Sequence, residues 1–208
     1  MSTQAFQQFL KQLDAKDYAK ADGFDLNWYD QMSSTELKEA EKLLLAQAHT
    51  GDMSPVPSLA KIATPAAVAF LKQTFEAKNY YPESGLDYEL AKYLWDLTRD
   101  ESYLQVFDAI KLNNKSKRLR VIHLLSCLPD TAKRIQQLLT ISKTDNDMVN
   151  RFQAAKEILT LTGILKKDFS NLEELRPLLN KISSGNKQEK ADGQAELSNF
   201  IEAYNSGH

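Results

Sequence analysis

His123 and Cys127 are the residues whose types and spacing could do chemistry. They lie four positions apart in the stretch SKRLRVIHLLSCLPD, residues 116–130. Residues four apart share one face of a helix, so this pair could form a nucleophile with its base or two ligands of a zinc ion. A nucleophilic cysteine also needs a third group that orients the base, and oxyanion donors, which this helix does not supply. A zinc site needs further ligands, and the remaining histidines are His49 and His208.

The helix that carries this pair has a clear apolar side. At about 100° per residue, the core-facing arc holds Leu119, Val121, Ile122, Leu125 and Leu128. His123 and Cys127 fall outside that arc, in a stripe with Ser116 and Arg120. We therefore expect a structural pair that is partly buried against a neighbouring helix. A redox-sensitive thiol beside Arg120 stays open as an alternative.

Motifs of the common enzyme classes are missing from the chain. The sequence has no G-x-G-x-x-G, P-loop, G-x-S-x-G or H-E-x-x-H pattern. The carboxylate pairs Asp100-Glu101 and Glu173-Glu174 stand at predicted helix starts, where acidic side chains favour the positive end of the helix dipole. The sequence therefore predicts no enzyme, no cofactor and no metal site.

Helix signals run from end to end, and no segment alternates apolar and polar residues as a half-buried strand would. Ser33 with Glu36, and Ser170 with Glu173, have capping-box spacing, and Thr64-Pro65 places a cap before proline. We expect helix stops at Gly51, Gly85, Gly163 and Gly185. The predicted helices span residues 2–13, 25–31, 34–50, 56–62, 65–78, 86–98, 101–112, 116–128, 131–143, 147–162, 171–183 and 188–204.

Three of these helices carry a similar pattern of apolar residues near their start. Leu90-Ala91-x-x-Leu94, Val121-Ile122-x-x-Leu125 and Ala154-Ala155-x-x-Ile158 follow one another at 31 and 33 residues. Each is followed by a second amphipathic helix, and an earlier pair around Ala40 and Ala67 fits the same scheme. Helical hairpins that cannot bury their apolar face alone stack on their neighbours.

The segments GDMSPVPSLAKIATPAAVAFLKQTF and DMVNRFQAAKEILTLTGI resemble short HEAT-like repeats. Arg151, Ala155 and Arg120 match the usual first-helix pattern, whereas the earlier repeats carry Glu39 and Glu89 at the arginine position. The resemblance implies an all-α fold, a right-handed α-solenoid of antiparallel hairpins. It predicts one continuous domain with an N-terminal helical cap at 1–32, a repeat array at 33–183 and a C-terminal capping helix at 184–208. Trp28 and Tyr29 would cover the end of the core within the first cap.

Charge is unevenly distributed along a chain whose net charge is only −2. Residues 111–143 carry a charge of +7, because they contain Asp130 as the only acidic residue and eight basic ones: Lys111, Lys115, Lys117, Arg118, Arg120, Lys133, Arg134 and Lys143. Flanking acidic residues would repel phosphate, so we expect no nucleic-acid partner. No apolar run is long enough to span a bilayer, the N-terminus does not resemble a signal peptide, and one cysteine suits a reducing compartment. These features predict a cytoplasmic protein with no membrane partner.

Aromatic residues are dense between Tyr80 and Phe107, and tyrosine and tryptophan dominate binding hot spots. The sequence therefore predicts a non-catalytic protein-recognition module, and the family analogy suggests a bacterial immunity protein that occludes a cognate toxin. The predicted contact residues are Trp95, Tyr103, Lys133 and Arg134. A scaffold or adaptor in a larger complex, or a HEAT-like enzyme acting on nucleic acid or a chromophore, remains an alternative.

Overall fold

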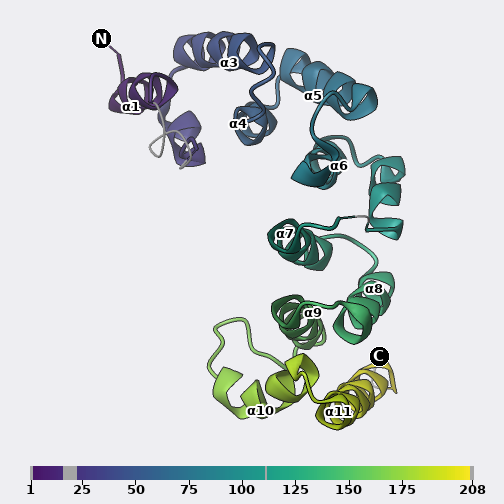
Figure 1. The fold of residues 1–208 in the computed structure, drawn as a ribbon. Helices are drawn as coiled ribbons and strands as arrows, with labels where there is room; N and C mark the ends of the chain where they lie inside the picture. The colour runs from purple at the N-terminus through teal and green to yellow at the C-terminus, as the bar shows by residue number, and fades with distance from the viewer. Residues whose placement is uncertain (1, 16–22, 111, 207–208) are drawn as a thin grey trace. The chain divides into compact units, whose positions relative to one another are not determined.

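The computed structural model describes residues 2–15, 23–110 and 112–206. Within these ranges the protein is all-helical and contains no strand, as the sequence predicts (Figure 1). Lys111 and His208 lie outside the described residues. No helix of the described ranges has both the length and the apolar content that a membrane span requires.

The chain divides into two compact units, Met1–Pro82 with Glu89–Gln105, and Glu83–Tyr88 with Val106–His208. The helices up to Ala77 are α1 (Gln4–Leu13), η1 (Leu26–Gln31), α3 (Ser34–Ala48), α4 (Val56–Ile62) and α5 (Pro65–Ala77). They are followed by η2 (Pro82–Ser84), α6 (Leu86–Thr98) and η3 (Glu101–Asp108), of which α6 and η3 each contribute to both units. The last five helices are α7 (Lys115–Ser126), α8 (Thr131–Thr144), α9 (Met148–Leu161), α10 (Leu172–Ser183) and α11 (Lys187–Ser206).

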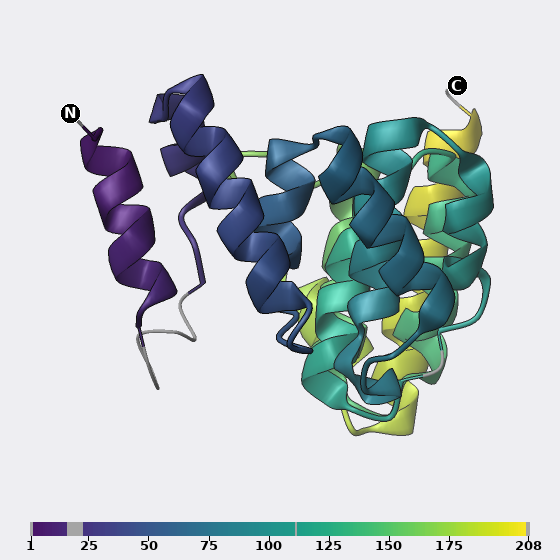
Figure 2. The same ribbon diagram turned by 90° about the horizontal axis from the view of Figure 1, so that it is seen from above.

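In the first unit, Glu36 ties two helix starts together. Its carboxylate accepts hydrogen bonds from the backbone N–H of Ser33 at 2.8 Å, which completes the predicted capping box of α3. The same carboxylate accepts from the N–H of Thr3, the N-cap of α1, at 2.6 Å. As a result α1 packs beside α3 (Figure 2). The N–H groups of Thr3 and then Ser33 are the largest causes that lower the pKa of Glu36 from 4.5 to about 2.

We predict that Glu36→Gln destabilises the first unit at neutral pH. Because the folded state binds the Glu36 proton more weakly, the carboxylate stabilises the fold fully above pH 4.5, and this contribution is lost as the pH falls towards 2. The difference in urea midpoint between wild type and variant should therefore shrink across that interval. Glu39→Gln on the exposed face of α3 is the matched control and should behave like wild type at every pH. A difference that stays constant with pH would contradict this role.

Two aromatic side chains from different helices meet in the core of the first unit. Tyr29 of η1 is 4% exposed and meets the ring of Phe9 edge-on, with centroids 6.1 Å apart. Burial is the largest cause that raises the pKa of the Tyr29 phenol to about 12, and the nearby Ser58 side chain opposes this shift. Trp28, by contrast, is only half-buried. Tyr29 is thus the more buried of the two predicted capping residues.

The three packing patterns predicted for the repeats are confirmed as core. Leu90, Ala91 and Leu94 are fully buried in α6, and the corresponding residues of α7 and α9 are at most 1% exposed. In the second unit α9 packs against α7, α8 and α10, and α10 packs against α11. The apolar period therefore predicted correctly which face of each helix is covered.

Local signals were less reliable at three places. The helix predicted at 101–112 is a 3₁₀ helix that ends at Asp108, and the Phe107 carbonyl near its end accepts a hydrogen bond from the Gln137 side chain at 2.8 Å. The Ser170–Glu173 capping box is absent, since α10 begins after Asn171 and Glu173 binds Arg176 instead. Gly51, Gly85 and Gly163 have positive φ, but Gly185 does not.

Candidate functional site

Arg151 of α9 joins the ends of two other helices. Its guanidinium donates to the carbonyls of Asp145 at 2.9 Å and Asn146 at 3.2 Å, directly after α8. It also donates to three carbonyls at the end of α10, those of Ile182, Ser183 and Ser184 at 3.3, 2.7 and 3.1 Å. Arg151 is only 7% exposed. A single buried cation therefore satisfies carbonyls at the negative ends of two helices.

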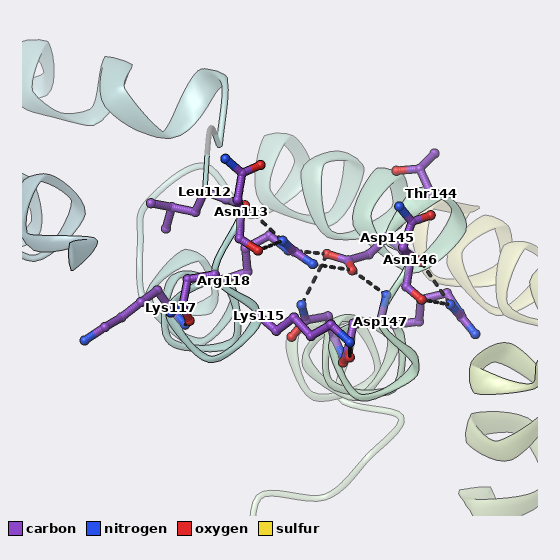
Figure 3. Close-up of polar contacts among 12 residues, drawn as sticks. Leu112, Asn113, Lys115, Lys117, Arg118, Thr144, Asp145, Asn146 and Asp147 are labelled. Atoms are coloured by element: carbon purple, nitrogen blue, oxygen red, sulfur yellow. Dashed lines mark hydrogen bonds and ion pairs between the residues drawn. The ribbon is translucent and has the colours of Figure 1, made fainter. Parts of the chain in front are cut away.

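Arg118 of α7, which lies 33 residues before Arg151, makes part of the same set of contacts (Figure 3). It donates to the carbonyls of Leu112 and Asn113 at 2.9 and 2.8 Å, six and five residues before it, as Arg151 does with Asp145 and Asn146. Its other nitrogens form a bidentate pair with the Asp145 carboxylate at 2.8 and 3.0 Å. The 33-residue period is thus repeated in hydrogen bonds as well as in apolar residues.

Asp145 is the acceptor at the centre of this network. Besides Arg118, it accepts from the N–H of Asp147 at 2.8 Å and from the Asn150 amide at 3.3 Å. Asp147 in turn caps α9 and pairs with Lys115 at 3.0 Å. Figure 3 shows the side chains of Lys115 and Arg118 directed from α7 towards these two carboxylates. The start of α9 is therefore fastened to the start of α7 by two ion pairs.

Beside this network lies a cleft of about 380 Å³. One wall is the segment Phe107–Ile110, and the others come from α7 and α8. The lining residues are Phe107, Asp108, Ala109, Ile110, Arg118, Ile122, Gln137, Thr140, Ile141, Thr144 and Asp145. We call this feature the 107–145 cleft.

The charges in the 107–145 cleft are already paired. Arg118 holds Asp145, and Asp108 forms an ion pair with Lys133 at 2.8 Å. The hydroxyls of Thr140 and Thr144 donate to carbonyls of their own helix, at Gln136 and Thr140. Isoleucine side chains supply much of the remaining lining. Such a surface suits an apolar side chain of a partner, since it offers apolar area without an unpaired charge.

The predicted contact residues Lys133 and Arg134 have different environments, although they are neighbours in α8. Lys133 is exposed and pairs with Asp108 at the cleft. Arg134 is 2% exposed and donates to Gln137 at 2.6 Å, while Gln137 holds the Phe107 carbonyl. Burial, opposed by Asp108 and Asp130, lowers the pKa of Arg134. Arg134 therefore lies in the interior, where it holds Gln137, a residue that lines the cleft.

Trp95 and Tyr103 belong to the first unit. Trp95 is half-buried, with Lys92 Nζ and Arg99 Cζ lying 5.5 and 4.7 Å from its ring centroid. Tyr103 meets the ring of Phe75 edge-on at 5.4 Å, and partial burial is the largest cause that raises its pKa. Both rings keep exposed atoms, so both stay candidate contacts. Lys133 and Arg134 belong to the second unit.

His123 and Cys127 both lie at the surface of the second unit. His123 is exposed and its Nδ1 lies 3.2 Å from Oε1 of Glu157 in α9. Cys127 caps the end of α7 and is exposed, which corrects the expectation of a partly buried thiol. The reason is that α7 ends at Ser126, so Cys127 leaves the helix face that it would have shared with His123. Among the described residues, no group of three or more His, Cys, Asp or Glu side chains could hold a metal ion.

Sequence reasoning missed Arg118 and Asp145 as the centre of the site. The missed signal is the similarity of LNNKSKR, residues 112–118, to DNDMVNR, residues 145–151. Asn114 and Asp147, 33 residues apart, both cap the following helix with their side chains. This register aligns Arg118 with Arg151, where the sequence analysis had used Arg120.

The chain matches no family model, no curated protein and no solved structure.

Proposed function

We propose that this chain is a non-catalytic protein-recognition module that binds a partner through the 107–145 cleft, as an immunity protein does when it occludes a cognate toxin. The observation that carries the proposal is the cleft itself, whose lining combines isoleucine side chains with charges that are paired within the chain. Paired charges need no ionic ligand, and a rigid apolar recess accepts a partner side chain at little ordering cost.

We further propose that the hairpins stack as a right-handed α-solenoid of the HEAT-like kind. The equivalent bonds of Arg118 and Arg151 support this arrangement, because stacked repeats place equivalent residues in equivalent neighbourhoods. The cytoplasmic location stays a prediction. Trp95 and Tyr103 are proposed as additional contacts on the first unit.

Thr140→Arg tests the cleft. Thr140 is exposed in the wall formed by α8, so an arginine there fills the recess without entering the core. We expect affinity capture from the native cell to lose the partner, with binding weakened by about tenfold or more, equivalent to about 1.4 kcal/mol. Thr131→Arg adds the same charge at an exposed position of α8 outside the cleft and should capture normally.

The activity of the captured partner then separates the two protein-binding functions. Loss of that activity on forming a one-to-one complex supports occlusion of a toxin. A partner that stays fully active in the complex supports a scaffold instead. If Thr140→Arg captures the same partner with unchanged affinity, the cleft is not the binding surface.

A further inference from the structure

The loop that joins α9 to α10 holds an aromatic residue in an unusual conformation. Phe169 has a φ of +58°, in the left-handed region that bulky L-residues rarely adopt. Its ring is nevertheless 46% exposed. Backbone strain of this kind persists only where the surrounding structure imposes it, and it often accompanies binding.

Hydrogen bonds hold this loop in place. The Phe169 N–H donates to the Lys166 carbonyl at 2.8 Å, and the Leu172 N–H donates to the Phe169 carbonyl at 3.1 Å. The Asn171 side chain accepts from the Lys166 N–H at 3.0 Å and donates to the Ile164 carbonyl at 2.8 Å. Leu165 is 1% exposed and anchors the loop in the core. The exposed ring is therefore presented by a preformed loop.

Three lysines lie next to this ring or in its loop. Lys156 of α9 places Nζ 4.4 Å from the ring centroid, and Lys166 and Lys167 are exposed residues of the same loop. In the part of the chain that the structure describes, none of the three makes an ion pair. The adjacent Asp168 accepts a hydrogen bond from the Ser170 N–H at 3.0 Å, which lowers its pKa, and it contributes one negative charge against the three lysines. This contrasts with Lys115, Arg118 and Lys133, whose charges are paired.

We propose that Phe169, Lys156, Lys166 and Lys167 form a second contact surface that binds an acidic segment of a partner protein. Carboxylates of the segment pair with the three free ammonium groups, and an apolar side chain of the segment packs on the exposed ring. A preformed loop that presents an exposed ring beside cations loses little conformational freedom on binding. This inference rests on one premise of the proposed function, namely that the ligand is a protein.

An anionic membrane is the less favoured ligand for this surface. Lys156 covers one face of the Phe169 ring, so inserting the ring into hydrocarbon would desolvate that ammonium group or pull it away. An acidic segment has no such cost, because its carboxylates replace water around the same lysine. The loop also offers a single exposed aromatic residue, whereas interfacial helices present a whole apolar face.

The experiment uses the full chain and a displayed library of short peptides rich in Asp and Glu, each with one aromatic or aliphatic residue. We expect the selected peptides to bind with chemical-shift changes confined to Lys156 and residues 165–171. Phe169→Asn removes the ring with a residue that tolerates the left-handed region, and should weaken binding at least about tenfold without lowering thermal stability. The double variant Lys166→Glu, Lys167→Glu should weaken binding as strongly, and added salt should weaken it for wild type.

Lys187→Glu with Lys190→Glu is the matched control, because it makes the same charge change in the first turn of α11. This control should bind the selected peptides within about twofold of wild type. Failure to enrich acidic peptides over basic ones would overturn the proposal, and so would chemical-shift changes outside Lys156 and residues 165–171. Binding to phosphatidylserine vesicles in place of peptides would assign the surface to a membrane and overturn it as well. None of these outcomes depends on Thr140, so the cleft is judged by its own experiment.

Discussion

Replacing Arg151 with methionine should lower the free energy of unfolding of the second unit by about 3 kcal/mol. Methionine keeps much of the apolar stem, but the five carbonyls that Arg151 contacts at the ends of α8 and α10 lose their donor. Buried acceptors without a partner are costly. Urea unfolding followed by circular dichroism measures the loss, and hydrogen exchange should show the opening concentrated in α8, α9 and α10 rather than in α3 to α5.

Two variants control for this effect. Arg176→Met removes an exposed arginine that pairs with Glu173 one turn away, so its urea midpoint should stay close to that of wild type. Arg151→Lys keeps the charge but cannot reproduce the planar fork, and should recover less than half of the loss. If Arg151→Met proved as mild as Arg176→Met, the proposed joining of α8 to α10 would be wrong.

Replacing Gly193 with alanine should destabilise the contact between α10 and α11, by about 2 kcal/mol. An added Cβ would lie 2.8 Å from Cβ of Lys181 and 2.9 Å from the backbone nitrogen of Ile182. The nearest atoms belong to the α10 backbone or lie next to it, so the helices must separate. Alanine gains about 1 kcal/mol of helix propensity over glycine, which this clash outweighs. The thermal midpoint of the variant is the measurement.

Gly185→Ala is the matched control for Gly193→Ala. Nothing lies within 4 Å of an added Cβ at Gly185, and its φ is not positive. This variant should be neutral or slightly more stable than wild type, because alanine restricts the unfolded chain. A Gly193→Ala protein that also gains stability would show that α10 and α11 are not in close contact.

The sequence predicted the helical elements well because their signals are local. α3 begins at the capping box of Ser33 and Glu36, and α5 begins at Thr64 before Pro65, as expected. The errors occurred where a distant group replaced a local one. Gln137 bonds the Phe107 carbonyl near the end of η3 from 30 residues away, and this contact cannot be seen in the residues around Phe107.

The candidate site was predicted only in part. Lys133 and Arg134 were selected from a run of positive charge, but a count of charged residues does not tell which of them are buried. The fold places Arg134 in the interior beside Gln137 and pairs Lys133 with Asp108. Arg118 was counted only as part of the same run, although its partner Asp145 lies 27 residues away. Lys115, Arg118 and Lys133 of the basic segment are therefore ion-paired within the fold, and the lysines near Phe169, which lie outside that segment, were not selected.

The sequence by itself determined the helical class of the described residues and the buried face of each repeat, because periodicity and caps act within one or two turns. Only the tertiary structure decided the exposure and the neighbours of His123 and Cys127. The chain leaves the helix at Ser126, so the thiol turns outward, and the exposed imidazole lies beside Glu157 of α9. Burial and charge pairing depend on residues brought together from distant positions, and a pattern in one stretch of sequence cannot contain them.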